Sequence, residues 1–133
     1  MLQNFIPKLI QDLELGKTNL SSLNPGVYTF PLEDGLSIDM SDIPNDGFML
    51  KCNVAPFPKV KEELFVTQAM MGNLFGQGTR GAILGLNPDG TILTLTLIVD
   101  YPADYKDFRN SLEDFINVMD FWREEALNPT PIK

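Results

Sequence analysis

The sequence predicts an α+β fold in which an antiparallel sheet packs against helices, with the element order α-β-β-β-α-β-β-α. Apolar residues recur every three or four positions near both ends of the chain and once in between, which is typical of helices. The rest of the chain consists of short strand-like runs separated by turns rich in Pro, Gly and Asn. These strands follow one another directly and do not alternate one by one with helices. The 133 residues, 44% of them hydrophobic, are expected to form one domain over residues 1–133.

A β-hairpin between Gly76 and Asp100 is the clearest strand signal. Its turn, at residues 87–90, reads Asn-Pro-Asp-Gly, which are residues that a type I turn favours. After the turn the residues alternate with period two, so we expect one buried face, made by Leu93, Leu95, Leu97 and Val99. The opposite face is only half polar and suits contact with another surface; it carries Ile92, Thr94, Thr96 and Ile98.

The first helix is predicted from Phe5 to about Leu15. Asn4 is the expected N-cap, which places Pro7 in the first turn, where its missing N–H costs little. Gly16 is expected to end the helix. The apolar stripe of this helix is formed by Leu2, Phe5, Ile6, Leu9, Ile10 and Leu13.

Three short strands are predicted next, over residues 27–32, 36–40 and 48–55, joined as an antiparallel meander. Turn residues separate them, and Pro56 and Pro58 are expected to end the third strand because proline cannot donate to a ladder.

A second helix over residues 59–75 is apolar on two sides. We expect the stripe of Val60, Leu64, Thr67, Met71 and Leu74 to face the core. The second surface holds Phe65, Ala69, Met70 and Gly72. A helix that is apolar on two sides is usually covered on both, and in a small domain the second cover is often another subunit. The adjacent pair Met70 and Met71 suits either core packing or a plastic binding surface, and core packing is the expectation for each residue alone.

The last helix is expected to begin after an N-cap at Asp104 and to end before Asn128-Pro129. Its apolar residues keep a spacing of three and four over five turns: Tyr105, Phe108, Leu112, Phe115, Met119, Trp122 and Ala126. The tail, residues 128–133, is expected to be mobile.

Composition excludes several classes of function. The formal charge of −8 disfavours direct contact with nucleic acid or with an anionic membrane surface, because both need clustered Lys and Arg. No run has transmembrane length, and the N-terminus lacks the features of a signal peptide. The absence of histidine removes the commonest general base and metal ligand, so an enzyme is not expected. The single cysteine, Cys52, cannot form an internal disulfide, which indicates a reducing cytoplasm.

Three motifs resemble chemical sites but are better explained structurally. Residues 76–81 match G-x-G-x-x-G, yet the glycines leave a helix and enter a strand, which is the reverse of a dinucleotide-binding loop. Asp39, Asp42 and Asp46 lack the spacing of an EF-hand, so a solvated turn is favoured over a calcium site. Cys52 has no histidine to activate it and is expected to be a structural thiol. No cofactor and no metal is therefore expected.

The passage NLFGQGTRGAILGLNPDGTILTLTLIVDYP, residues 73–102, resembles the class I chaperones of bacterial type III secretion, a Tir-chaperone-like family. The element order, the low pI and the mass near 15 kDa agree with this resemblance. It implies a dimeric protein of the bacterial cytoplasm that binds the N-terminal region of a secreted effector in extended form, without ATP. The partner in the dimer is a second copy or a related chaperone, and the resemblance leaves both open.

The resemblance also implies which residues make contact. The effector-binding surface is expected to use surplus apolar side chains from the first helix and the first three strands: Leu2, Phe5, Leu9, Leu13, Val27, Phe30, Ile38 and Phe48. The effector is also expected to be able to add a strand to an exposed sheet edge. The dimer interface is expected to use the second surface of helix two and the glycine-spaced strand: Phe65, Ala69, Met70, Gly72, Gly81, Ile83 and Gly85. The alternative function is a regulatory module that binds a folded partner, such as transcription or secretion machinery.

Overall fold

The computed structural model describes residues 2–12, 27–32, 35–44, 47–58, 62–75 and 81–127. The predicted element order is confirmed: α1 (Leu2–Asp12), β1 (Val27–Pro31), β2 (Ser37–Ile43), β3 (Gly47–Pro56), α2 (Glu62–Phe75), β4 (Ile83–Leu86), β5 (Ile92–Val99) and α3 (Tyr105–Leu127). In this part of the chain the strands form one antiparallel sheet in the order β1-β2-β3-β5-β4. The tail that was expected to be mobile, residues 128–133, lies outside the described residues.

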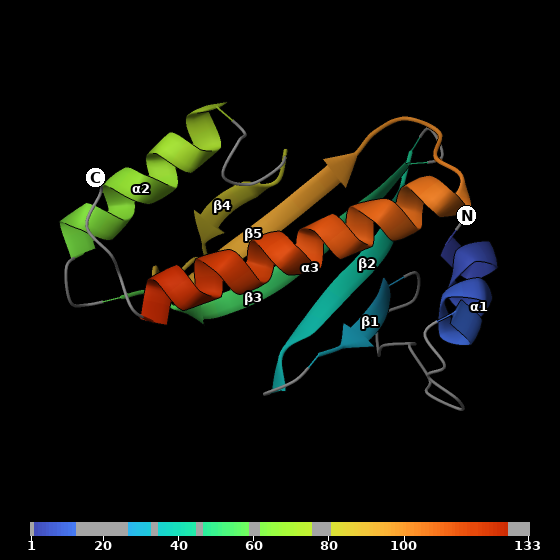
Figure 1. Ribbon diagram of the computed structural model, residues 1–133, viewed down its shortest axis with the longest axis horizontal. Helices are drawn as coiled ribbons and strands as arrows, with labels where there is room; N and C mark the ends of the chain where they lie inside the picture. Colours follow the sequence, from blue (N-terminus) through green and yellow to red (C-terminus); the bar gives the residue numbers. More distant parts are fainter. Residues whose placement is uncertain are drawn as a thin grey trace.

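Helix α3 crosses one face of the sheet and organises the core (Figure 1). Its buried residues follow the predicted spacing, with Val118 added and Tyr105 only half-buried. Near its N-terminal end, α3 contacts α1 through Phe5 and Phe108, whose ring centroids are 5.4 Å apart. Near its C-terminal end it contacts α2, where Phe65 meets the edge of Trp122 at 6.1 Å. The three helices therefore share one core against the sheet.

Two local signals in the sequence are confirmed in detail. In the β4–β5 turn, the Gly90 amide donates to the Asn87 carbonyl at 2.9 Å, and Gly90 has a φ of 71°. The Asn87 Oδ1 atom also accepts the amides of Thr91 and Ile92 at 2.8 and 3.0 Å. At the start of α3, the Asp107 amide donates to Asp104 Oδ1 at 2.8 Å, as an N-cap requires.

The predicted start of the first helix is wrong. Helix α1 begins at Leu2, so Pro7 lies inside it and Asn4 is not its N-cap. The reason is a contact from a distant strand, because the Leu2 amide donates to Asp42 Oδ1 at 3.0 Å. That carboxylate satisfies one of the amides that a helix start leaves without a partner. The predicted end near Leu15 lies outside the described residues.

The predicted inner stripe of the second helix is wrong at Thr67 and Met71, which are exposed. Leu64 is half-buried, and Val60 lies outside the described residues. Helix α2 starts at Glu62, and Phe65 rather than Thr67 or Met71 faces the core. Phe65 is completely buried between Phe57 and Trp122, with its ring edge-on to both. These two aromatic contacts set the rotation of the helix. Met71 is therefore turned outward, and the expectation that the two methionines pack in the core is corrected.

The bounds of the meander strands differ from the prediction: β1 ends one residue early, β2 ends three residues late, and β3 is one residue longer at each end. β2 continues to Ile43 because it pairs with β3 up to Ile43 and Gly47, beyond Ser41, where its pairing with β1 ends. β3 runs through Pro56, which stands opposite Ile92 after an irregularity in register between Asn53 and Ala55. The strand thus accommodates one proline at its end, where a lost ladder bond costs least.

Candidate functional site

The carboxylates of β2 have structural partners. Asp39 Oδ1 accepts a hydrogen bond from Thr29 Oγ1 at 3.0 Å, and Asp42 caps α1. Asp46, the third aspartate considered for a calcium loop, lies outside the described residues. Within the described ranges, no group of three or more His, Cys, Asp or Glu side chains is placed to hold a metal ion.

Cys52 is buried in β3, and its Sγ donates to the Asn53 carbonyl at 3.4 Å. Burial raises the pKa of the thiol to about 11, and the negative charges of Asp39 and Asp120 act in the same direction. The thiol is therefore protonated at neutral pH and is a poor nucleophile. This environment agrees with the predicted structural thiol.

Most of the predicted effector-binding residues are core residues in this structure. The expectation that the stripe of helix one is surplus to the core is corrected, because these side chains pack against α3 and the sheet. The buried members of the set are Leu2, Phe5, Leu9, Phe30, Ile38 and Phe48. Val27 is half-buried, and Leu13 lies outside the described residues. Their contact with an effector stays a prediction, and it requires a client to reach side chains that the isolated chain covers.

Polar contacts on the surface reinforce the docking of α1 on α3. The Tyr105 hydroxyl donates to Asp12 Oδ2 at 2.5 Å, and Arg109 Nη1 lies 3.5 Å from the same oxygen. Lys8 Nζ lies 5.6 Å from the centre of the Tyr105 ring. Burial raises the pKa of Tyr105 to about 12, with a further contribution from the hydrogen bond to Asp12. Such exposed contacts each contribute little to stability, so the apolar stripe holds the helix.

The predicted dimer-interface residues divide into buried and exposed groups. Phe65 is fully buried within its own chain, and Ala69 is partly buried against the core. Met70 is 66% exposed and Ile83 is 59% exposed. Gly81 has a φ of 89°, a conformation that L side chains rarely adopt. The two remaining members of the set are glycines. Gly72 lies in α2, and Gly85 lies in β4 and is half-buried.

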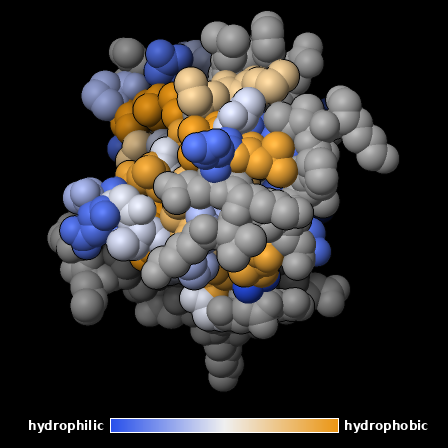
Figure 2. All heavy atoms as spheres, turned by 90° about the vertical axis from the view of Figure 1, so that its left-hand side faces the viewer, coloured by the Kyte–Doolittle hydropathy of each residue, from blue (hydrophilic) through white to orange (hydrophobic). Residues whose placement is uncertain are grey.

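Large apolar side chains are exposed on three elements, α2, β4 and β5, and we call this set of residues the α2–β4–β5 surface. Its members are Val66, Met70, Met71, Ile83, Leu86 and Ile98. Figure 2 faces the α2 and β4 side and shows apolar side chains gathered in its upper part. Sequence reasoning had expected the opposite face of β5 to suit a contact, and Ile98 on that face is 54% exposed, whereas Thr94 is buried.

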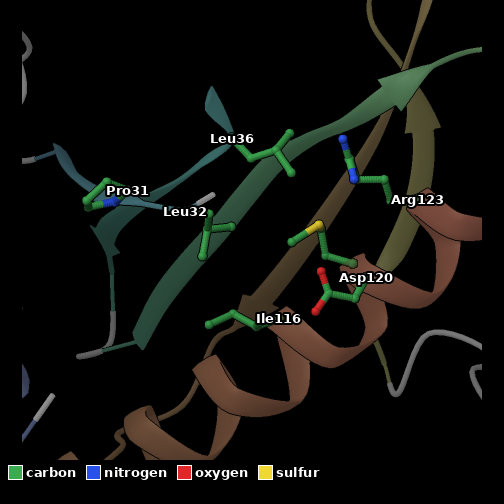
Figure 3. A pocket seen from close by; sticks show the side chains of 7 residues that line it. Pro31, Leu32, Leu36, Ile116, Asp120 and Arg123 are labelled. Carbon is green, nitrogen blue, oxygen red and sulfur yellow. The ribbon is translucent and has the colours of Figure 1, made fainter. Parts of the chain in front are cut away.

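A second feature is a groove of about 620 Å³ on the other half of the sheet. It lies between the β1–β2 connection and α3, as Figure 3 shows. Apolar residues and two charged residues line it: Pro31, Leu32, Leu36, Ile116, Met119, Asp120 and Arg123. Sequence reasoning missed this groove, because its lining comes from two segments that are eighty positions apart along the chain.

Of the helices in the described parts of the chain, none combines the length and the apolar character that crossing a membrane requires.

Comparison with known proteins identifies the family. Residues 4–123 of this chain match the model of the Tir chaperone protein (CesT) family. A protein of Chlamydia pneumoniae, CPj0713/CpB0740, is 27% identical over 124 residues, which cover 88% of this chain and 92% of that protein.

Solved structures share the fold at low sequence identity. A chain of the HopA1–SchA chaperone–effector complex is similar with a TM-score of 0.67 and 14% identity, covering 92% of this chain and 93% of that one. A chain of the ExsC–ExsE complex gives a TM-score of 0.70 at 9% identity and covers 97% and 96%. A chain of the heterodimeric ExoU–SpcU complex from the type III secretion system of Pseudomonas aeruginosa gives 0.68 at 15%, covering 98% and 100%.

These findings confirm the resemblance inferred from residues 73–102, and the match extends over most of the chain. The protein belongs to the Tir chaperone protein (CesT) family.

Proposed function

We propose that this protein is a type III secretion chaperone that binds the N-terminal region of a secreted effector and holds it in extended form. The observation that carries the proposal is the family match over residues 4–123. A structure of similar fold, HopA1–SchA, is itself a chaperone–effector complex. Binding needs no ATP, because the chaperone contributes only surface and the client stays soluble while it is bound.

The client lies on the side of the molecule formed by α1, β1, β2 and β3. β1 is the first strand in the sheet order and pairs with β2 alone among the described strands, so its outer edge offers backbone groups to an extended segment. Val27, half-buried in this strand, contacts the client directly. The buried members of the predicted set, such as Phe30 and Ile38, support this surface from the core.

A second polypeptide covers the α2–β4–β5 surface, either a second copy of the chain or a related chaperone. Met70, Met71 and Ile83 are large, apolar and about half exposed or more, and methionine adapts readily to an irregular partner. The protein works in the bacterial cytoplasm, where the effector is held before secretion.

Co-expression tests this function. The chain, tagged and produced with a candidate effector from the same source, is expected to retain a fragment that holds the effector's N-terminal region after ATP is removed with apyrase. Retention of a folded domain in place of the N-terminal region would support the alternative, a regulator acting on a folded partner. Release of the client on removal of ATP would contradict the proposed mechanism.

A further inference from the structure

Helix α1 covers one end of the core, where α3 and β2 are its main neighbours. Figure 1 shows it at the edge of the molecule, beside the N-terminal end of α3. Its inner residues Phe5 and Leu9 are buried. Phe108 of α3 contacts the Phe5 ring at 5.4 Å and the Phe48 ring of β3 at 5.2 Å, measured between ring centroids. Release of α1 therefore uncovers part of Phe108 but leaves its contact with the sheet in place.

The rest of the core is built without α1. β3 pairs with β2 on one side and with β5 on the other, and α3 packs against β3. Towards the far end of α3, the rings of Phe65 and Trp122 contact each other with centroids 6.1 Å apart. Cys52, in the middle of β3, is 2% exposed. Because these contacts do not involve α1, the helix is able to detach while the sheet and α3 stay folded.

Helix α1 has little stability of its own. It has 11 residues, and an isolated helix of this length is marginal in water. Pro7 lies inside it and has no N–H to donate to the carbonyl four residues earlier. The stability of α1 therefore comes from its docking on the rest of the chain.

Polar contacts fasten both ends of α1. At its start the Leu2 amide donates to Asp42 Oδ1 at 3.0 Å, and at its end Asp12 Oδ2 accepts from the Tyr105 hydroxyl at 2.5 Å. Arg109 Nη1 lies 3.5 Å from the same Asp12 oxygen. The contacts of Asp12 are exposed, so water replaces them readily when α1 moves. The end of α1 next to α3 is therefore the end that opens at low cost.

The docked helix hides side chains that the client is expected to reach. Phe5 and Leu9 belong to the effector-binding set that the family resemblance implies, and both are buried in the closed chain. An apolar client segment reaches them, and the part of Phe108 that Phe5 covers, only after α1 has moved. When the binding-competent state is a small fraction of the molecules, the apparent affinity is reduced by that fraction.

We propose that α1 is a releasable cover, and that the client binds a minor state in which α1 has left α3. The inference rests on the proposed function and names its regulation. The Tyr105–Asp12 contact sets the population of the open state, so a change that weakens this contact strengthens client binding.

Thiol labelling of the chain alone tests whether α1 opens by itself. Leu9→Cys places a thiol on the buried stripe of α1, and the natural Cys52 reports on the sheet. Labelling with iodoacetamide is followed by mass spectrometry of peptides, and each rate is divided by the rate in the urea-unfolded chain. We expect the introduced thiol to react at least about tenfold faster than Cys52, because local opening is more frequent than global unfolding. Equal rates would mean that α1 leaves only when the whole chain unfolds, and would overturn the inference.

Removal of one hydroxyl tests the fastening contact. Tyr105→Phe in the Leu9→Cys chain is expected to speed labelling of the introduced thiol about fivefold and to leave Cys52 unchanged. Tyr101→Phe, which removes the hydroxyl of an exposed tyrosine outside α1 and α3, is the control and should change neither rate. Because Leu9→Cys itself loosens the stripe, amide hydrogen exchange in α1 is also compared between the wild type and Tyr105→Phe. Faster exchange in the variant is expected, and unchanged exchange would contradict the role of this contact.

Cross-linking tests the effect on binding. Asp12→Cys with Arg109→Cys places two thiols where the salt bridge lies, and a short bismaleimide joins them. The probe is the purified N-terminal region of the effector used for co-expression. The joined form is expected to bind it at least about tenfold more weakly than the same variant capped with N-ethylmaleimide, because α1 no longer leaves α3. Equal binding by the joined and capped forms would overturn the cover while the chaperone function stands. Binding by neither form nor by the wild type would count against the proposed function itself.

Discussion

The side chains of Phe5 and Leu9 belong to the core, although the family resemblance implies that they bind an effector. Both side chains lie in the hydrophobic core, and both are less than one-tenth exposed. Phe5 lies in an aromatic cluster with Tyr105 and Phe108, at centroid distances of 5.9 and 5.4 Å. Substitution of Phe5 and Leu9 is therefore expected to lower the stability of the fold before it affects client binding.

We expect Phe5→Asp with Leu9→Asp to lower the free energy of unfolding by at least roughly 4 kcal/mol, through lost packing and buried charge. Urea denaturation followed by circular dichroism measures the change. Gln11→Asp, on the exposed side of α1, is the matched control and should stay within about 0.5 kcal/mol of the wild type. A double variant of wild-type stability would show that the stripe is a contact surface after all.

The buried thiol of Cys52 makes stability depend on alkaline pH. Its pKa is about 11 in the folded chain against an ordinary value of 9.0, so the unfolded chain loses this proton first as the pH rises. The stability that the neutral thiol contributes is complete below pH 9 and is lost between about pH 9 and 11, on the order of 2–3 kcal/mol. The difference in unfolding free energy between wild type and Cys52→Ala should shrink across this window. A difference that stays constant from pH 8 to 11 would contradict the assigned environment.

At the scale of elements, Gly47 fixes how β3 meets β5. A Cβ atom at this position would lie 1.9 Å from the Val99 carbonyl oxygen, and the next residue, Phe48, pairs with Val99. The backbone of β5 has no room to move without breaking that pairing. This position therefore requires glycine for close approach.

Gly47→Ala is expected to destabilise the chain by about 2 kcal/mol or more. Gly85→Ala serves as the control, because its Cβ would meet only the flexible Thr94 side chain, at 3.4 Å. Thermal unfolding should show a clear fall in Tm for Gly47→Ala and little change for Gly85→Ala. Equal effects of the two substitutions would mean that glycine is not needed for the approach of β3 to β5.

The elements that the sequence predicts well are those whose signals are local. The β4–β5 turn depends on Asn87 to Gly90, and the start of α3 depends on Asp104 and Asp107, so neighbours along the chain suffice. The start of α1 depends on Asp42, forty positions away, and no local pattern contains that information.

The candidate surfaces were predicted less well for the same reason. The rotation of α2 depends on Phe57 and Trp122, and only the folded chain brings them to Phe65. Hydrophobic spacing identifies apolar side chains but does not say which of two faces is inside. Met70 and Ile83, two residues of the predicted dimer interface, are exposed in the single chain, and their contact with a second chain stays a prediction.

At the scale of the whole molecule, buried and exposed apolar residues are unevenly placed. The α1 side keeps its apolar stripe inside, whereas the α2–β4–β5 surface leaves six large apolar side chains at least one-third exposed. Exposed apolar groupings of this kind mark interfaces in soluble proteins. The charge of −8 limits indiscriminate association, so we expect a specific partner on this surface.

If the partner on this surface is a second copy, the purified chain sediments with twice its mass of 14.9 kDa, and Met70→Asp with Ile83→Asp returns it to the single-chain mass. If the partner is a related chaperone, the same double variant no longer co-purifies with it. These positions are better tests than Gly81→Leu, which would strain a backbone with φ of 89°, or Ala69→Arg, which would disturb the core. Phe121→Asp, 53% exposed on α3, is the control and should sediment as the wild type does. An unchanged mass in the double variant would remove this surface from the interface.

The central claim is that an effector's N-terminal region is bound in extended form, and amide hydrogen exchange on the complex tests it most directly. We expect binding to slow exchange in stretches of the effector's N-terminal region, while the rest of the effector exchanges as it does alone. Protection confined to a folded domain of the effector, with an N-terminal region that exchanges as freely as before, would contradict the claim.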